Sequence, residues 1–436
     1  MRKIFLNFCV VTNISLMLIN ISYSQNPPCW IQQNSGTNTT LNEIYFINKN
    51  TGWVVGGLES NGTNGVITKT TNGGNNWITQ FTGNNNFQKV FFINQNTGFV
   101  AGGYIIPPFI SNRIVLKTTN GGGNWVVLLN DSQSPLPLAS IYFVDSLLGW
   151  IGSDENFGIL KTTNGGQNFI NMNISYSSYD IQFTDSTTGY FGGLTTLCKT
   201  TNRGNNWNLI YTDPTRNIRK LFFINSLKGY AVGHNTVLKT YNGGLNWTLL
   251  DGGDYLERLS IHFVDSSYGA IILYDNYPTD WSALDLTTNA GINWTRQTGW
   301  PNALMSVFFI NKDTGWVCGM NGLILKTITG GITSVNNIKS KLPDNFALFQ
   351  NYPNPFNPVT KIKFDIKKSV VSSQYSVVSL KVYDITGREI NTLVNEQLQP
   401  GTYEVTFDGS NLPSGIYFYK LNAGNYSETK KLILMK

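Results

Sequence analysis

Two pairs of neighbouring acidic residues have the residue types that general acid–base chemistry requires. Asp254 is followed closely by Glu257, and Asp154 is adjacent to Glu155 in this chain of 436 residues. Hydrolysis of a glycosidic bond uses two carboxyl groups that flank the bond at a set separation. Both pairs also lie in polar segments between strand-like runs, where solvated carboxylates are expected without any chemistry. We adopt this second interpretation.

The other residue types that carry chemistry are sparse and scattered. The chain has two histidines, His234 and His262, and four cysteines, and none of them stand at the spacing of a metal-binding motif. No Ser-His-Asp arrangement and no glycine-rich phosphate loop is recognisable. The sequence therefore predicts neither a bound metal nor a cofactor.

The distribution of charge argues against nucleic acid as a partner. Residues 25–335 contain 17 Lys+Arg and 17 Asp+Glu, whereas residues 336–436 contain 12 and 8. Nucleic-acid binding depends on clustered positive charge, which a balanced segment does not supply. One basic cluster, Arg216, Arg219 and Lys220, is a candidate binding patch for an acidic partner. We prefer to interpret it as a solvated loop, because short charge runs usually serve solubility.

A sevenfold internal repeat between Ile44 and Ile328 indicates which elements position these side chains. Each copy has an apolar run, a glycine that an aromatic residue follows in six of the seven copies, and a version of Lys-Thr-Thr-Asn-Gly-Gly. The repeated glycines are Gly52, Gly98, Gly149, Gly189, Gly229, Gly269 and Gly315. Their successive spacings of 46, 51, 40, 40, 40 and 46 residues suit a four-stranded propeller blade.

Each part of a copy predicts one strand. An apolar run such as Val90–Ile93 predicts the innermost strand, buried on both faces, and an Asn or Asp then turns the chain. The glycine-aromatic step begins the second strand, and a run such as Val66–Lys69 predicts the third. Asn-Gly-Gly supplies the positive φ angles of a tight hairpin before the fourth strand. His262 stands where other copies have Tyr or Phe, so a role in the core is expected.

The hairpin phrase has a family resemblance. Thr70-x-Asn72-x-Gly74-x-Asn76-Trp77 resembles the Asp-box, in which Ser or Thr, Asp, Gly and Trp recur between the third and fourth strands of a blade. With the preceding glycine-aromatic phrase, residues 30–335 resemble the propeller of the photosystem II assembly and stability factors and their bacterial relatives. Six copies have Asn in place of the Asp, and the seventh has Thr329 there. The resemblance implies a scaffold and does not name an activity.

The piece missing from the seventh copy lies near the N-terminus. Trp30-Ile31-Gln32-Gln33 is similar to Trp77-Ile78-Thr79-Gln80, whereas Ser334 takes the place of the Trp in the seventh copy. We expect the N-terminal segment to supply the fourth strand of the last blade and to join the two ends of the ring. The predicted fold is all-β, with a seven-bladed β-propeller over residues 25–335.

After a predicted linker at residues 336–345, residues 346–436 predict a second domain. Strand-like runs separated by Gly, Pro and Asn turns predict an immunoglobulin-like β-sandwich. They are Lys361–Ile366, Ser379–Asp384, Glu389–Val394, Thr402–Asp408, Gly415–Leu421 and Ser427–Met435. In this domain, Asn351–Pro358, Val382–Glu389, Leu412–Tyr417 and Lys430–Lys436 together resemble the type A C-terminal sorting domain of the type IX secretion system. The resemblance implies export across the outer membrane, with the type IX machinery as partner; the alternative is a sandwich module that assists folding.

The N-terminal residues 1–24 predict a signal peptide. Arg2 and Lys3 precede the apolar stretch Ile4–Ile21, and cleavage is expected after Ser24. A transmembrane anchor is not predicted, since a span needs about 20 mostly apolar residues. The predicted location is outside, or on the surface of, a Gram-negative cell, reached through the periplasm. The remaining Cys29, Cys198 and Cys318 are expected to be buried thiols rather than disulfide partners.

Irregular insertions in the repeat are the expected places for binding specificity, because binding residues concentrate on loops carried by a rigid scaffold. The insertions are Leu58–Gly65, Tyr104–Asn112 and Tyr274–Trp281, and within the last we take Tyr277 and Trp281 as candidates. The recurring aromatics, such as Trp53, are expected to pack between blades instead.

The sequence thus predicts a secreted or cell-surface propeller that binds an extracellular protein or glycan without catalysis. One alternative is an exported Asp-box glycoside hydrolase, either sialidase-like or polysaccharide-degrading. The six arginines of residues 25–335 show no phrase typical of a sialidase site. Another alternative is an envelope assembly factor with a protein client in the periplasm, against which the sorting domain argues.

Overall fold

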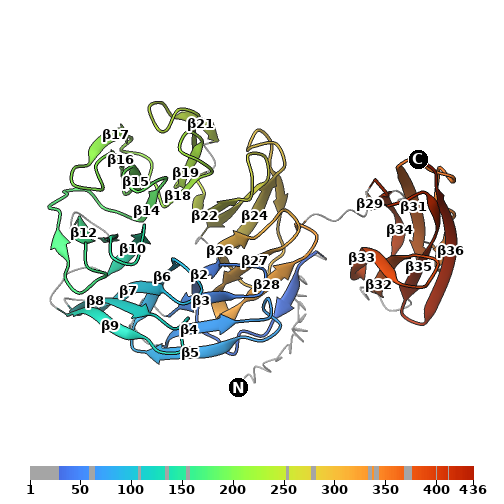
Figure 1. Ribbon diagram of the computed structural model, residues 1–436, viewed down its shortest axis with the longest axis horizontal. Coiled ribbons are helices and arrows are strands. Elements are labelled where there is room, and N and C mark those ends of the chain that lie inside the picture. The colour runs from blue at the N-terminus through green and yellow to red at the C-terminus, as the bar shows by residue number, and fades with distance from the viewer. Residues whose placement is uncertain are drawn as a thin grey trace, which may run out of the picture.

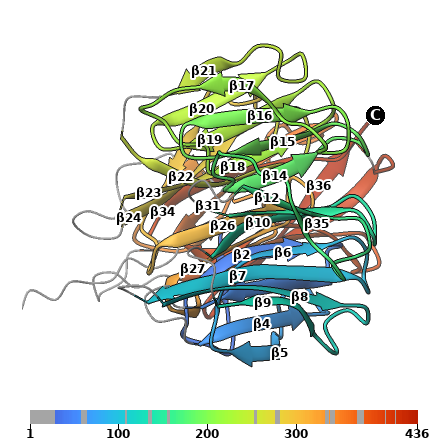
Figure 2. The same ribbon diagram turned by 90° about the vertical axis from the view of Figure 1, so that its left-hand side faces the viewer.

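The computed structural model describes residues 29–57, 64–106, 110–132, 137–153, 158–251, 255–275, 281–331, 336–337, 343–367, 376–398, 400–410 and 412–436. In these residues the fold is β throughout, apart from a single 3-10 turn, η1 (Met320–Gly322). Residues 31–327 form seven four-stranded antiparallel sheets (Figures 1 and 2). One edge strand of each sheet, which we call its innermost strand, lies toward a common centre. We number these sheets 1 to 7 in chain order.

The first four sheets follow the repeat in order. Sheet 1 has β2 (Leu41–Phe46), β3 (Gly52–Gly56), β4 (Gly65–Thr70) and β5 (Ile78–Gly83). Sheet 2 has β6 (Asn86–Phe92), β7 (Gly98–Ile106), β8 (Ile110–Thr118) and β9 (Val126–Asp131). Sheet 3 has β10 (Leu138–Phe143), β11 (Gly149–Ser153), β12 (Ile159–Thr162) and β13 (Ile170–Asn171). Sheet 4 has β14 (Asp180–Phe183), β15 (Gly189–Gly192), β16 (Thr196–Thr200) and β17 (Asn208–Thr212).

The last three sheets include the one that combines both ends of the repeat region. Sheet 5 has β18 (Lys220–Phe223), β19 (Gly229–Gly233), β20 (Thr236–Thr240) and β21 (Thr248–Asp251). Sheet 6 has β22 (Glu257–Phe263), β23 (Gly269–Asp275), β24 (Trp281–Thr287) and β25 (Thr295–Gln297). Sheet 7 has β26 (Leu304–Phe309), β27 (Gly315–Gly319), β28 (Ile324–Thr327) and the N-terminal strand β1 (Ile31–Gln33).

Strand β1 is the outer strand of sheet 7, the place that the sequence similarity around Trp30 predicts. Ile31 is paired with Lys326 and Gln33 with Ile324 in an antiparallel ladder. The indole of Trp30 is buried and contacts Phe309 edge to face, with ring centroids 6.0 Å apart. The ring is therefore joined by hydrogen bonds between its first and last strands, and β28 is not left as an open edge.

Aromatic side chains hold each sheet to the next. Trp53 of sheet 1 stacks on Phe92 of sheet 2 with ring centroids 3.5 Å apart, and Trp316 of sheet 7 stacks on Phe46 of sheet 1 at 3.6 Å. The glycine before each of these aromatics leaves room for the ring of the first strand, because a Cβ on Gly52 would lie 2.5 Å from Phe46. The glycine-aromatic step of the repeat is therefore a packing device between sheets.

The turn between the third and fourth strands is built by its own side chains. Thr70 Oγ1 accepts hydrogen bonds from the backbone N–H groups of Asn72 and Gly74, at 3.3 and 2.8 Å, and Asn72 Oδ1 accepts from Asn76 N at 2.9 Å. Gly74 has a φ angle of +92°, which favours glycine. The lysine before the threonine reaches the next sheet, since Lys69 Nζ donates to Gly121 O at 2.7 Å. The Lys-Thr-Thr-Asn-Gly-Gly phrase thus both makes a turn and clamps neighbouring sheets.

The C-terminal residues form two further four-stranded sheets. One contains β29 (Asn336–Asn337), β34 (Gly401–Asp408), β31 (Val359–Ile366) and β30 (Ala347–Leu348). The other contains β33 (Glu389–Leu398), β32 (Ser376–Tyr383), β35 (Gly415–Ala423) and β36 (Tyr426–Leu434). Buried residues from both sheets, including Phe364, Val405, Leu380 and Leu421, form one hydrophobic core. Asn336 pairs with Glu404 of β34, so the first residues of the segment predicted as a linker belong to strand β29.

The proline-rich phrase at residues 351–358 fastens the last strand. Asn351 is buried, and its side-chain amide donates to Pro353 O and to Thr360 Oγ1, both at 3.0 Å. Phe356 is also buried, and its backbone bonds with Ile433 and Met435 on either side of the end of β36. The separate C-terminal motifs recognised in the sequence are therefore parts of one packed unit.

Candidate functional site

The innermost strands surround a channel, and their side chains alternate between this channel and the contacts between sheets. In β2, β10 and β26 the six residues share one burial pattern, in which the second and fifth are partly exposed and the others are buried. The expectation that these strands are buried on both faces is wrong. Residues on the channel side, such as Glu43 and Tyr45 of β2 and Ser306 and Phe308 of β26, line a cavity at the centre, where the innermost strands leave space between them.

The next-to-last residues of the innermost strands line what we call the aromatic cavity, of about 280 Å³. Its ring consists of Tyr45, Phe91, Tyr142, Gln182, Phe222, His262 and Phe308. Polar members bond to the backbone of the next sheet: Tyr45 Oη donates to Phe92 O at 3.1 Å, and Gln182 Oε1 accepts from Phe223 N at 2.8 Å. These polar groups are therefore engaged in holding the ring together.

His262 has such a structural position. Its Nδ1 accepts from Phe309 N at 3.4 Å, and its ring lies between Phe222 and Phe308, with centroids 4.9 and 4.5 Å away. Burial, together with the positive charge of Lys220, lowers the pKa of His262 to about 3. The imidazole is therefore neutral near pH 7, as the core role expected from the sequence requires.

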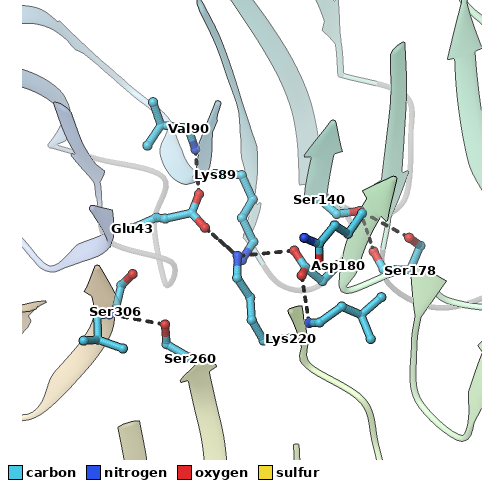
Figure 3. A network of polar contacts seen from close by, with 12 residues as sticks. Glu43, Lys89, Val90, Ser140, Ser178, Asp180, Lys220, Ser260 and Ser306 are labelled. Atoms are coloured by element: carbon cyan, nitrogen blue, oxygen red, sulfur yellow. Dashed lines mark hydrogen bonds and ion pairs between the residues drawn. The ribbon is translucent and has the colours of Figure 1, made fainter. Parts of the chain in front are cut away.

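The residues three positions before the last residue of each innermost strand form a polar layer (Figure 3). They are Glu43, Lys89, Ser140, Asp180, Lys220, Ser260 and Ser306. Four of them accept a hydrogen bond from a backbone N–H of the following sheet, in the pairs Glu43–Val90, Asp180–Leu221, Ser260–Val307 and Ser306–Ile44. Because an innermost strand has no strand partner on its inner edge, these acceptors satisfy N–H groups that would otherwise be unpaired.

Four charged members of this layer, which we call the charge network, come from four different sheets. Lys220 Nζ lies 2.7 Å from Glu43 Oε1 and 3.3 Å from Asp180 Oδ1, and Lys89 Nζ lies 3.5 Å from Glu43 Oε1. Burial raises the pKa of Glu43, but Lys220, Lys89 and the Val90 N–H outweigh it, and the pKa is lowered. Asp180 and Glu43 likewise outweigh burial at Lys220 and raise its pKa. Glu43 therefore stays ionised and paired.

The basic cluster predicted from the sequence is divided by the structure. Lys220 begins β18 and belongs to the charge network, so its interpretation as part of a solvated loop is wrong. Arg216 pairs with Asp213 at 3.1 Å. Arg219 pairs with Glu257 at 2.8 Å, and its guanidinium lies over the ring of Tyr179, 5.5 Å from the centroid. The alternation of strand residues separates Arg219 from Lys220, since adjacent side chains point to opposite sides.

Arg219 lines a second cavity, of about 450 Å³, which we call the mouth. Its lining is Thr40, Asn42, Gly57, Asn86, Gln88, Lys89, Ala139, Tyr179, Arg219, Leu259, Met305 and Met320. Seven of these residues stand one position before a member of the polar layer. Gly57 and Met320 belong to connections between second and third strands, so the mouth opens at the end of the ring opposite the Thr-x-Asn-Gly-Gly turns. Lys89 lines both cavities.

The other candidates have mixed positions. Trp281 begins β24, opposite Asp275, and the Arg296 guanidinium lies over its ring, 6.0 Å from the centroid. Tyr277 lies outside the described residues, as do Asp154, Glu155 and Asp254. The described bases of all three insertions lie at the mouth end of their sheets, because each insertion joins a second strand to a third strand.

Sequence reasoning missed the charge network because it began each apolar run one residue too late. The run Val90–Ile93 leaves out Lys89, and a repeat that begins at Ile44 leaves out Glu43, the third residue of β2. Lys220 was interpreted as part of a loop although it begins β18. Aligning the seven innermost strands at their glycine-proximal ends would have put all residues of the polar layer in one column. A charged residue inside an otherwise apolar strand would then have indicated a common, buried position.

Cys29, Cys198 and Cys318 are buried thiols, as expected. Burial raises the pKa of Cys198 to about 12, which makes its thiol unreactive at neutral pH. In the described part of the chain, His, Cys, Asp and Glu form no group of the kind that holds a metal ion. None of the described segments is a helix with the length and apolar character needed to span a bilayer.

Residues 350–435 match the family described as the secretion system C-terminal sorting domain. The C-terminal domain is a type IX sorting domain. Its strands β31 to β36, its buried Asn351 and its fastened last strand lie in this matched region. A sorting domain of this kind implies export by the type IX secretion system.

Solved structures show that the remainder is a β-propeller. YCF48 bound to D1 peptide superposes with a TM-score of 0.54 and 17% identity, covering 70% of this chain and 99% of that one. YCF48 from Cyanidioschyzon merolae superposes with a TM-score of 0.50 and 18% identity, covering 69% of this chain and 98% of that one. At these identities the likeness concerns the fold alone. The search of curated proteins gave no match.

Proposed function

We propose that this protein is an exported binding protein, in which the propeller holds a ligand at the mouth and the sorting domain delivers it to the cell surface or the medium. The observation that carries the proposal is the mouth itself, a cavity with polar and apolar lining on a rigid ring. A cavity of this size lies in the range of ligand sites, and its irregular neighbours are the connections where binding residues concentrate. Export begins, in this proposal, with removal of a signal peptide at residues 1–24 and passage through the periplasm.

We further infer a seven-bladed ring and an immunoglobulin-like sandwich as the finer description of the two domains. Seven successive four-stranded sheets and the stacking of Trp316 on Phe46 support a closed ring of seven blades. Two four-stranded sheets around one core support the sandwich. A rigid, closed ring suits binding because its cavities keep their shape without a ligand.

We infer an extended peptide as the ligand. The mouth has amide side chains at Asn42 and Gln88, which can bond to a peptide backbone, and apolar side chains at Leu259 and Met305. One of the solved structures with this fold contains a bound peptide, which concerns that protein and shows only that the fold can serve this purpose. A glycan ligand is the alternative outcome of the experiment below.

We propose binding without catalysis because the carboxylates near the channel are committed to other bonds. Glu43 accepts from Val90 N and pairs with two lysines, and Asp180 accepts from Leu221 N and pairs with Lys220. Glu257 pairs with Arg219. A general acid needs a raised pKa and a carboxyl oxygen that can reach the substrate. The pKa of Glu43 is lowered, and its carboxylate is bonded to Val90 N and to two lysines.

Deletion of the sorting domain tests export. Strand β29 belongs to a C-terminal sheet, so the deletion removes residues 336–436 rather than beginning after the predicted linker. The intact chain is expected in the medium or at the cell surface, and the truncated chain in the periplasm. An Arg219→Gln variant of the full chain is the control and is expected to be exported normally. Equal export of the truncated and intact chains would contradict the proposal.

Binding is tested on the purified full chain with three assays in parallel: a random octapeptide array, a glycan array and a glycoside hydrolysis screen. We expect peptides to be bound, and no turnover of glycosides. Retention of glycans alone would replace the peptide by a carbohydrate ligand. Turnover that is lost in a Glu257→Gln variant would favour the hydrolase instead.

A further inference from the structure

We propose that the peptide segment held at the mouth presents a carboxylate to Lys89 and Arg219, beside an apolar group that lies against Leu259 and Met305. This inference rests on the proposed function and specifies the chemistry of its ligand. The carboxylate can come from an acidic side chain or from the C-terminus of the peptide.

The first support is the charge of the mouth. Among its described lining residues, Lys89 and Arg219 are basic and none is acidic. Glu43 and Glu257 bond to these cations at 3.5 and 2.8 Å, and neither carboxylate belongs to the described lining of the mouth. The described lining therefore offers a ligand positive charge, in a cavity whose low-dielectric walls strengthen attraction for a negative charge.

The second support is the position of Lys89 in the charge network. Its ammonium has three N–H donors, and its contact with Glu43 Oε1 is long at 3.5 Å, since Lys220 binds the same oxygen at 2.7 Å. The Lys89 side chain is 18% exposed, and it is the basic residue shared by both cavities. Burial and the Lys220 ammonium lower the pKa of Lys89, which shows that Glu43 and Asp180 compensate its charge incompletely. An anion in the mouth supplies the missing partner.

Arg219 is the second group for the anion. Its side chain is 42% exposed, and the stacking over Tyr179 holds the guanidinium plane at the edge of the mouth. Glu257 accepts the Nε–H, which is one of five N–H donors in a guanidinium. Arg219 is thus held in position, and other N–H groups of its guanidinium can donate to an anion.

The apolar side of the mouth determines what lies next to the carboxylate. Leu259 and Met305 stand one position before Ser260 and Ser306 in the innermost strands of sheets 6 and 7, and Met320 of η1 lines the same cavity. Lys89 lies in β6 of sheet 2, and Arg219 directly precedes β18 of sheet 5. A volume of about 450 Å³ accommodates a side chain or a chain end, and not a folded domain. An acidic group with an apolar neighbour on an extended peptide fits both sides.

The test uses the random octapeptide array with two arms, one with free and one with amidated C-termini. The full chain is compared with Lys89→Met, Arg219→Gln and the control Lys49→Met. Lys49 is exposed in the turn after β2, at the opposite end of that strand from the mouth, so its substitution removes the same charge elsewhere. Bound peptides are expected to be enriched in Asp, Glu or a free C-terminus next to apolar residues. We expect signals to fall at least tenfold in Lys89→Met and severalfold in Arg219→Gln, and to stay unchanged in the control.

The outcomes separate this inference from the proposed function. Peptide binding with no enrichment in carboxylates, or binding retained in both mouth variants, would overturn the carboxylate and leave peptide binding intact. No peptide binding at all would overturn the proposed function and this inference with it. Thermal unfolding shows whether Lys89→Met is folded. If Lys89→Met is not folded, two other measurements test the inference: peptide binding by Arg219→Gln, and wild-type binding at different salt concentrations. If a charge pair holds the peptide, wild-type binding must weaken severalfold between about 50 and about 500 mM NaCl.

Discussion

The two ends of the propeller ring differ in how far their residues repeat from sheet to sheet. At the turn end, the same residues recur in successive sheets and make the same bonds, as Thr70 with Gly74 and Thr118 with Gly122 show, both at 2.8 Å. At the mouth end, equivalent strand positions hold different residues, such as Asn42, Tyr179, Arg219 and Met305. Residues that repeat from sheet to sheet therefore indicate a structural role that every sheet shares. Residues that vary between sheets indicate the end of the ring where each sheet can contribute a different side chain.

The polar layer is an exception to this rule. Glu43, Asp180, Ser260 and Ser306 differ in type, yet each accepts a hydrogen bond from the next sheet's innermost strand. Their common task is defined by the acceptor oxygen, which carboxylates and hydroxyls both provide. Divergence in sequence is thus compatible with one structural role, and only the mouth residues beyond this layer are candidates for specificity.

Removing Glu43 is the strongest way to test this exception. Glu43→Ala deletes the acceptor for Val90 N and leaves Lys220 and Lys89 with less compensation for their charges. Breaking a buried ion pair by loss of one partner costs about 3–5 kcal/mol. We expect the free energy of unfolding of the propeller to fall by that amount, as measured by urea denaturation at pH 7.

Glu43→Gln is the matched variant, because the amide keeps an acceptor for Val90 N and removes only the charge. It is expected to lose less stability than Glu43→Ala. If both variants cost less than about 1 kcal/mol, the network does not stabilise the ring, and its residues would have to be explained by function instead.

A turn-end substitution gives the second effect. Thr118→Val removes the hydroxyl that accepts from the buried Gly122 N–H at 2.8 Å and from Asn120 N at 3.3 Å. An unsatisfied buried N–H costs roughly 1–3 kcal/mol. Because the turns are equivalent, Thr70→Val is expected to cost the same within about 0.5 kcal/mol. Clearly unequal losses in urea denaturation would contradict the shared role of the repeat.

The sequence predicted the fold well where the period of the repeat carries the information. The glycine spacing and the likeness of Trp30 to Trp77 predicted four-stranded units and the position of β1, because each unit repeats the same local turn and packing chemistry. The site was not predictable in the same way. Lys89 and Lys220 come from sheets 2 and 5 and share Glu43 through the closure of the ring, a contact that no local pattern encodes. Arg219 was named from its charge, and its place at the mouth follows from strand alternation.

The channel also offers a test that depends on pH. His262 has a pKa of about 3 in the folded protein, below its usual value of 6.5, so the unfolded chain binds a proton between these values and the folded chain does not. Stability therefore decreases as pH falls from 6.5, by about 1 kcal/mol at pH 5.5 for one such histidine. In His262→Phe, which copies Phe308 of the next sheet, we expect this decrease to be reduced by that amount. An unchanged pH profile in thermal unfolding would contradict the neutral, buried histidine.

The smallest effect is expected from adding charge at the turn end. Asn72 bonds through Oδ1, which accepts from Asn76 N at 2.9 Å and from Thr70 Oγ1 at 3.0 Å, and an aspartate offers the same oxygen. The chain already exchanges the two residues in the turns after the innermost strands. There, Asn48 and Asp265 each accept two backbone N–H bonds at 2.7–2.9 Å. Asn72→Asp is therefore expected to change the free energy of unfolding by no more than about 0.5 kcal/mol at pH 7.

What the substitution should change is the pH dependence below 5. The hydroxyl and backbone N–H of Thr187, with the backbone N–H of Thr188, lower the pKa of Asp185 in a comparable turn to about 2. The carboxylate introduced by Asn72→Asp is expected to follow it, so the variant keeps about the wild-type stability above the unfolded pKa of about 3.9 and becomes less stable than the wild type as pH falls toward about 2. A loss above about 1 kcal/mol at pH 7 in urea denaturation would mean that the Asn amide has a task of its own. In that case the Asn side chain at the turn end would have a role beyond fixing the conformation of the turn.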